Sequence, residues 1–116
     1  MLRILLVEDS ADDVDLLRFA LEDAGVPHEL RRVASEAALR PALEDFEPDV
    51  AVSDRFLPGY CGLRALALLH ELRPRLPLVL LSGVECDAVL PPTATMFQKS
   101  ELPRLSALLS NLHARP

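Results

Sequence analysis

Four apolar stretches of this sequence each end on polar side chains that can take part in chemistry. Two stretches end on carboxylates, a third ends on a hydroxyl, and the last ends on an ammonium group. The residues concerned are Glu8, Asp9, Asp54, Ser82 and Lys99. If the stretches are neighbouring parallel strands, their carboxyl ends meet at one edge of the sheet, where open α/β sheets bind their ligands.

The three carboxylates Glu8, Asp9 and Asp54 indicate a cation site, because converging negative charges repel one another unless a cation lies between them. Mg²⁺ suits the set better than Ca²⁺, since Mg²⁺ keeps several waters and needs only one or two carboxylates. Ser82 and Lys99 would then supply donors to an anion on the far side of the cation. This combination is typical of phosphoryl transfer. Asp54 is the most central acid, so it is assigned as the nucleophile that forms an aspartyl phosphate.

Each residue also has a simpler interpretation when it is taken alone. Asp54 could merely open a loop, and Glu8 and Asp9 could only stabilise the N-terminus of the next helix. Ser82 could belong to an ordinary turn, and Lys99 could be a solvated cation at a strand end. The coincidence of four strand ends favours a joint site. A flavin phosphate is disfavoured there, because the acidic loop would repel it.

Hydrophobic patterning predicts an α/β fold with a doubly wound, five-stranded parallel sheet. Near-continuous apolar runs such as 3–7 and 78–81 are typical of strands covered on both faces. Right-handed crossovers place helices on both faces, and the polar 28–33 strand suits an edge. The expected order, numbered along the chain, is 2-1-3-4-5, which is flavodoxin-like. The strands are expected at 3–7, 28–33, 49–54, 78–81 and 95–98, and the helices at about 11–24, 35–46, 62–72 and from 100 onward.

Caps and prolines predict where the helices begin. Ser35 and Ser100 are predicted N-caps, and Pro41 is expected to kink its helix or to delay its start. Asp12 and Asp13 suit the positive end of the 11–24 helix.

The crossover between the fourth and fifth strands is unusually short. Residues 83–94 are close to the minimum of roughly 10–12 residues for joining parallel strands. Only residues 84–90 have room for a helix before Pro91 and Pro92 forbid one. The fourth helix is therefore expected to be vestigial or absent.

Composition restricts the classes of protein that fit. The 116 residues are expected to form one domain, 1–116, with a single core and no effector domain. A formal net charge of −6 argues against nucleic acid or an anionic membrane as the partner. Cys61 and Cys86 do not make a disulfide framework and are interpreted as buried, reduced thiols. No apolar stretch is long enough to span a membrane, so a cytoplasmic location is expected.

The motifs resemble those of response regulator receiver domains of two-component signalling, and they cover nearly the whole chain. The matching segments are Leu5-Leu6-Val7-Glu8-Asp9-Ser10, Ser53-Asp54-x-x-Leu57-Pro58-Gly59-x-x-Gly62-Leu63, Leu81-Ser82-Gly83 and Phe97-Gln98-Lys99-Ser100. The resemblance implies that Asp54 accepts a phosphoryl group from a sensor histidine kinase or a histidine phosphotransfer protein. It also implies that Ser82 and Lys99 hold the phosphoryl oxygens.

The same resemblance implies a Mg²⁺ cofactor and a signalling role. Asp9, Asp54 and the backbone carbonyl of Phe56 would bind the ion, with Glu8 acting through water. Such a domain is not a general enzyme: it catalyses only its own phosphorylation and its own slow dephosphorylation. Phosphorylation would switch the binding of a downstream protein, and whether the domain forms a homodimer is left open.

The sequence departs from the family pattern at three places. The 83–94 segment is short, Met96 stands where the family usually has a Tyr or Phe that rotates inward on activation, and Ser100 follows the lysine where a proline is common. The first two fall on the face that normally relays phosphorylation to a partner. The switch candidates are therefore Ser82, Met96 and the neighbouring Phe97. The alternative function is a phosphorylation-independent interaction module, resembling a pseudo-receiver, with an altered output face. The two functions differ in whether phosphorylation changes oligomeric state or partner affinity.

Overall fold

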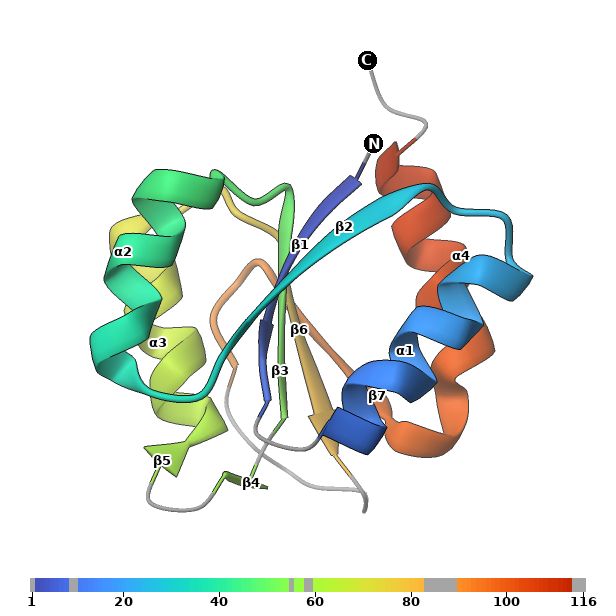
Figure 1. Cartoon of the computed structure of the whole chain (residues 1–116). Coiled ribbons are helices and arrows are strands. Elements are labelled where there is room, and N and C mark those ends of the chain that lie inside the picture. The colour runs from blue at the N-terminus through green and yellow to red at the C-terminus, as the bar shows by residue number, and fades with distance from the viewer. Residues whose placement is uncertain (1, 9–10, 55, 58–59, 83–89, 114–116) are drawn as a thin grey trace.

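The computed structural model describes residues 2–8, 11–54, 56–57, 60–82 and 90–113, and it has three layers (Figure 1). A parallel five-stranded sheet in the order β2-β1-β3-β6-β7 forms the middle layer. Its strands are β1 (Leu2–Val7), β2 (His28–Val33), β3 (Val50–Asp54), β6 (Leu78–Ser82) and β7 (Ala94–Gln98). This order confirms the predicted 2-1-3-4-5 topology.

Helices cover both faces of the sheet, as predicted. Helices α2 (Glu36–Phe46) and α3 (Gly62–Leu72) lie on one face, and α1 (Ala11–Asp23) and α4 (Leu102–His113) lie on the other (Figure 1). Two hydrophobic cores result, because successive strand residues point to opposite faces. Leu5 and Val7 pack in the core beneath α2 and α3, whereas Ile4 and Leu6 pack in the core beneath α1 and α4.

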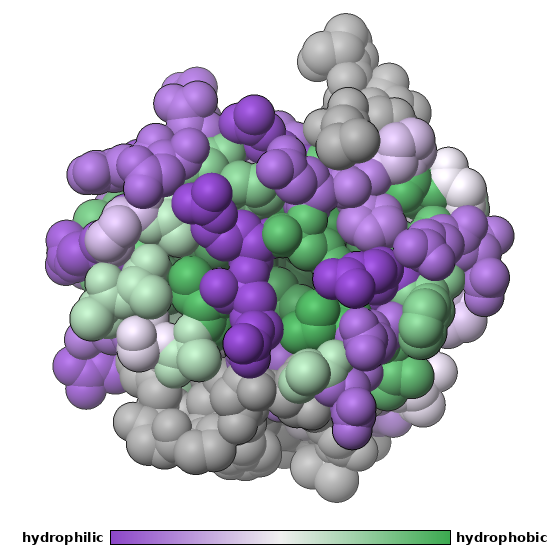
Figure 2. Space-filling view, viewed as in Figure 1, coloured by the Kyte–Doolittle hydropathy of each residue, from purple (hydrophilic) through white to green (hydrophobic). Residues whose placement is uncertain are grey.

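The edge strand β2 is polar, as the sequence indicated. Only Val33 of its six residues is buried. Hydrophilic side chains cover much of the molecular face that carries this strand (Figure 2). Charged residues on an edge strand discourage pairing with other chains, so this edge is protected against aggregation.

The predicted N-cap of α2 is confirmed, because the Ala38 N–H donates a hydrogen bond of 3.3 Å to Ser35 Oγ. Pro41 does not delay the start of this helix, which begins at Glu36 and continues through the proline. Pro41 is exposed, and the loss of one backbone donor there is compatible with a helix held by the buried Leu39 and Leu43.

The predicted N-cap at Ser100 is wrong. A short 3-10 helix, η1 (Lys99–Glu101), precedes α4, and its capping residue is Gln98. The Gln98 N–H donates a 3.0 Å hydrogen bond to the Glu101 carboxylate, which forms a capping box two residues before the expected position. This hydrogen bond, together with Arg104 beside it, holds the pKa of the Glu101 carboxyl below its usual value.

The expected vestigial helix at 84–90 falls almost entirely outside the described residues. In the part that the structure describes, residues 90–93 form a turn in which the Ala94 N–H donates to the Pro91 carbonyl at 3.0 Å. Four α-helices are present in the described ranges, and none of them has the length and apolar character needed to span a bilayer.

Candidate functional site

The carboxyl ends of β1, β3 and β6 bring three predicted site residues to one edge of the sheet. Glu8 follows β1 directly, Asp54 is the last residue of β3, and Ser82 is the last residue of β6. The register of the strands places these residues side by side at the end of the sheet, since Val7 pairs with Ser53 and Asp54 pairs with Leu81. All three side chains belong to buried residues.

Backbone hydrogen bonding explains why Glu8 is held at this level although it lies beyond β1. Its N–H donates to the Val33 carbonyl of β2 at 3.0 Å, so the parallel ladder extends by one residue. The residue after a strand normally leaves the sheet, but here the extra bond keeps the Glu8 backbone beside the site. Only 2% of Glu8 is exposed.

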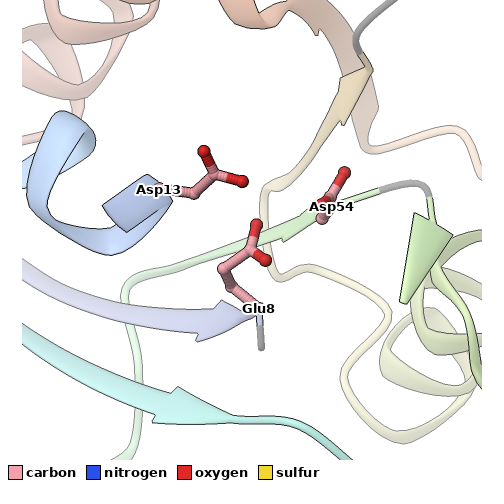
Figure 3. Close-up of side chains that lie close together, drawn as sticks. All are labelled: Glu8, Asp13 and Asp54. Carbon is pink, nitrogen blue, oxygen red and sulfur yellow. The ribbon is translucent and has the colours of Figure 1, made fainter. Parts of the chain in front are cut away.

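Three carboxylates meet at this edge: Glu8, Asp54 and Asp13 from the first turn of α1. Each offers an oxygen, and these oxygens all lie within 4.8 Å of one another. The three side chains point toward a common region (Figure 3). Asp54 is 7% exposed and Asp13 is half-buried. Like charges this close repel strongly in a poorly hydrated site, so the arrangement favours binding of positive charge.

The spacing of these oxygens fits a hard divalent cation. Two oxygens bound to one Mg²⁺ lie about 3 Å apart when they are adjacent and about 4.2 Å apart when they are opposite, given the usual bond length. The three oxygens, all within 4.8 Å of one another, are therefore close enough for side-chain movement to bring them onto a single ion. Carboxylate oxygen is also the ligand type that these ions prefer.

Asp13 is the site residue that the sequence analysis missed, since it interpreted this acid only as a partner of the helix dipole. A signal was present in the helical spacing. Asp13, Leu17 and Leu21 recur every four residues, and both leucines are buried against the sheet. Asp13 therefore continues the inward stripe of α1 beyond the core. Asp12 lies outside that stripe and is exposed.

The remaining predicted ligands are only partly described. Asp9 lies outside the described residues. Phe56 belongs to β4 (Phe56–Leu57), which pairs antiparallel with β5 (Tyr60–Cys61) just beyond Asp54. Lys99 is the first residue of η1 and follows β7, so its backbone lies at the same end of the sheet, but its side chain lies outside the description. The roles of these three residues stay predictions.

The sequence analysis did not predict the β4–β5 pair. It expected a turn at Pro58 and Gly59, two residues that lie outside the described ranges. Cys61 ends β5 as a free thiol that is exposed, so its predicted burial is wrong. Its place at the end of a two-residue surface strand, rather than on an inward helix face, explains the exposure.

Met96 and Phe97, the two switch candidates on β7, lie on opposite faces of the sheet. Met96 packs against the core beneath α2 and α3, whereas Phe97 belongs to the core beneath α1 and α4. Their strand partners are the consecutive residues Leu80 and Leu81. Phe97 therefore does not substitute for Met96 on the same face, and a movement of one is not a movement of the other.

Comparisons with known proteins agree with this fold. A family model described as "Response regulator receiver domain" matches residues 4–91. No curated protein sequence matches the chain. Among solved structures, the signal receiver domain of a DNA binding response regulator protein (merR) from Colwellia psychrerythraea 34H is 19% identical, with a TM-score of 0.83 over 99% of this chain and 100% of that chain.

Two further solved structures are similar over nearly their whole length. A response regulator receiver domain protein (CheY-like) from Methanospirillum hungatei JF-1 is 25% identical, with a TM-score of 0.72 over 97% of this chain and 94% of that one. A response regulator receiver domain protein from Clostridium thermocellum is 22% identical, with a TM-score of 0.76 over 97% and 94%. The shared architecture therefore extends from β1 to α4.

Proposed function

The chain belongs to the response regulator receiver domain family, and on this premise we propose that Asp54 accepts a phosphoryl group from a phosphohistidine. The donor would be a sensor histidine kinase or a histidine phosphotransfer protein. A carboxylate oxygen of Asp54 forms the new P–O bond as the P–N bond breaks, and the histidine nitrogen then takes a proton from water. The observation that carries the proposal is the position of Asp54, buried at the end of β3 within 4.8 Å of two further carboxylates.

The proposed cofactor is Mg²⁺, held by Asp9, Asp54 and the Phe56 carbonyl, with Glu8 acting through water. When bound, the ion neutralises negative charge on the phosphoryl group and on the acids around it. The oxygen-only cluster of Glu8, Asp13 and Asp54 supports this assignment.

Ser82 and Lys99 are proposed to hold the phosphoryl oxygens from the opposite side. The hydroxyl of Ser82 donates a hydrogen bond, and the ammonium of Lys99 offsets the charge that Asp54 gains when it becomes phosphorylated. The burial of Ser82 at the end of β6 supports its part in this arrangement, because few waters can compete for its hydroxyl. We expect the domain to act in the cytoplasm and to regulate a downstream protein.

The test is to incubate the protein with acetyl phosphate and Mg²⁺ and to follow its intact mass. The wild type is expected to gain one phosphoryl group, and the Asp54→Asn variant none. A phosphorylated histidine phosphotransfer domain serves as a second donor. If neither donor labels the folded wild-type protein in Mg²⁺, the proposed phosphoacceptor function is wrong.

A phosphorylation-independent interaction module is the second candidate. Two features of the sequence favour it: Met96 stands where the family usually has a Tyr or Phe, and the 83–94 crossover is short. The phosphoryl analogue beryllofluoride separates the candidates. A change in oligomeric state or partner affinity on adding it supports the switch, whereas an unchanged partner affinity supports the constitutive module.

A further inference from the structure

A cavity of about 260 Å³ lies at the amino end of the sheet, on the face that α4 covers, and the proposed function does not use it. We propose that this cavity binds a small monocarboxylate with a short apolar chain, and that Arg75 pairs with the carboxylate. Val50, the first residue of β3, lines the cavity, whereas Asp54 ends the same strand. The inference therefore does not rest on phosphoryl transfer at Asp54.

The sheet and α4 provide apolar walls for this cavity. Val50 and Val79 are at most 1% exposed, and Leu108 of α4 is partly buried against the same core. Thr95 pairs with Val79 and lines the cavity too, but it is exposed, so α4 leaves this corner of the sheet uncovered. An apolar chain that lies there would leave water on several sides, which favours its binding.

A single positive charge lines the cavity. Arg75 precedes β6, and within the described part of the chain its side chain forms neither a hydrogen bond nor an ion pair. None of the described residues that line the cavity is an acid. A guanidinium group binds a carboxylate through two parallel hydrogen bonds, so an anion with a planar carboxylate head fits this position.

A buried hydroxyl in the same wall lacks an acceptor. Thr93 lines the cavity, and its Oγ1 is buried without a hydrogen-bond partner among the described residues. Leaving such a group unpaired costs free energy, which a new acceptor would recover. A turn about the Cα–Cβ bond of Thr93 would let Oγ1 donate to a carboxylate held beside Arg75.

The volume of the cavity restricts the size of the ligand. A water molecule takes about 30 Å³ in the liquid, and a methylene group takes a similar volume. The cavity therefore holds about nine non-hydrogen atoms, and hexanoate is of this size. A dianionic phosphate would bring a second negative charge that Arg75 alone does not balance, and an unbalanced charge is costly beside apolar walls.

The loop before β6 offers a matched control for the charge of Arg75. Arg73 is also exposed, but its Nη1 donates to the Leu72 carbonyl at 2.9 Å, and it does not line this cavity. Arg73→Gln and Arg75→Gln remove the same charge from the same loop. A difference between the two variants therefore measures contact with the ligand and not a change in net charge.

The experiment is an NMR titration of the full chain with sodium hexanoate at fixed ionic strength. The wild type is expected to bind with a Kd of about 1 mM, as befits so small a ligand. The amide signals of Val79, Thr95 and Leu108 should shift more than those of Glu8 and Asp54. Arg75→Gln should weaken binding about tenfold, and Arg73→Gln less than about twofold.

Three results would overturn the inference. The first is the absence of saturable shifts in the wild type at about 20 mM hexanoate, well above the expected Kd. The second is an equal loss of affinity in the two arginine variants. The third is binding of hexylamine or hexanol as tight as that of hexanoate, because neither carries the carboxylate that Arg75 would recognise.

Thr93→Val tests the hydroxyl, because valine has nearly the same shape without the oxygen. In the free protein this variant should raise the urea midpoint, since it removes an unpaired buried hydroxyl. It should also weaken hexanoate binding by about threefold, an effect that a purely structural role would not produce. Unchanged hexanoate affinity in Thr93→Val would overturn the part assigned to Oγ1. All these measurements use unphosphorylated protein, so they succeed or fail independently of the proposed function.

Discussion

At the amino end of the sheet, Arg3 lies among groups that balance its charge, whereas at the carboxyl end three carboxylates lie together. Arg3 Nη1 donates to the Phe46 carbonyl at 2.8 Å, and its guanidinium lies 5.7 Å from the centre of the Phe46 ring. Its backbone N–H donates to Asp49 Oδ2 at 2.8 Å, and Glu29 Oε2 is 3.9 Å from Nε. An ion pair thus joins β1 to β2, and a backbone N–H joins β1 to Asp49, the residue before β3.

The carboxyl end differs in that three acids share one region of it. Glu8, Asp13 and Asp54 bring like charges together where two of the three are buried. A protein optimised for stability alone would avoid that arrangement, so its presence indicates a function. The comparison teaches that the amino end joins its charges to groups of neighbouring elements, whereas the carboxyl end concentrates acids at the site proposed to bind a cation.

The largest expected effect is on cation binding. Replacing Asp54 by Asn should lower Mg²⁺ affinity by about 100-fold, because a buried carboxylate ligand is lost. Replacing Arg3 by Ala, at the opposite end of the same sheet, should leave the affinity within twofold of the wild type. Calorimetric titration measures both affinities. A similar loss of Mg²⁺ affinity in both variants would show that the two ends of the sheet do not differ in cation binding.

The next effect is on stability at the amino end. Arg3→Ala should lower the free energy of unfolding by about 2 kcal/mol, since it removes a hydrogen bond to Phe46 and a cation–π contact together. Urea unfolding followed by circular dichroism measures the change. Arg18→Ala, which removes the half-exposed ion pair with Asp15, is the control and should change stability little.

A smaller effect of opposite sign is expected at the carboxyl end. Without divalent cations, Asp54→Asn should raise the free energy of unfolding by about 1 kcal/mol, because it relieves repulsion with Glu8 and Asp13. The same urea experiment in EDTA tests this, and excess Mg²⁺ should reduce or reverse the gain. A destabilised Asp54→Asn protein in EDTA would show that its carboxylate is structural.

The smallest effect concerns Glu101, a carboxylate near the same end that accepts hydrogen bonds from the Gln98 N–H and from Arg104. The Gln98 N–H and Arg104 lower the pKa of Glu101, so its charged form stabilises the fold. That contribution is present above the usual pKa of 4.5 and is lost as pH falls through the lower folded-state pKa. Glu101→Gln should therefore lower the urea midpoint at pH 7 but scarcely at pH 3. An equal shift at both pH values would mean that the charge of Glu101 is irrelevant.

Sequence patterns predicted the elements better than the contacts between side chains. The strand His28–Val33 and the helix Gly62–Leu72 have the predicted bounds. Gly25 and Pro27 mark the turn before the strand, and apolar periodicity together with Pro74 marks the helix. The β4–β5 pair was missed, since two residues per strand are too few to show a period. The Gln98 cap was missed because it depends on Glu101 reaching back to a backbone N–H.

The site was predictable where strand ends define it and less so where a helix contributes. Glu8, Asp54 and Ser82 follow from three strand ends and the order of the sheet. Asp13 required the rotation of α1 about its axis, which the sequence indicates only through the spacing to Leu17 and Leu21. The roles of Asp9 and Lys99 rest on the motif resemblance.

The most direct test of the central claim identifies the residue that carries the phosphoryl group. The protein is incubated with acetyl phosphate and Mg²⁺, reduced with borohydride, digested and mapped by mass spectrometry. Reduction converts an aspartyl phosphate to homoserine, and the account predicts homoserine at position 54 alone. A reduced acid at position 8, 9 or 13, or no reduced acid in a protein that binds Mg²⁺, would contradict it.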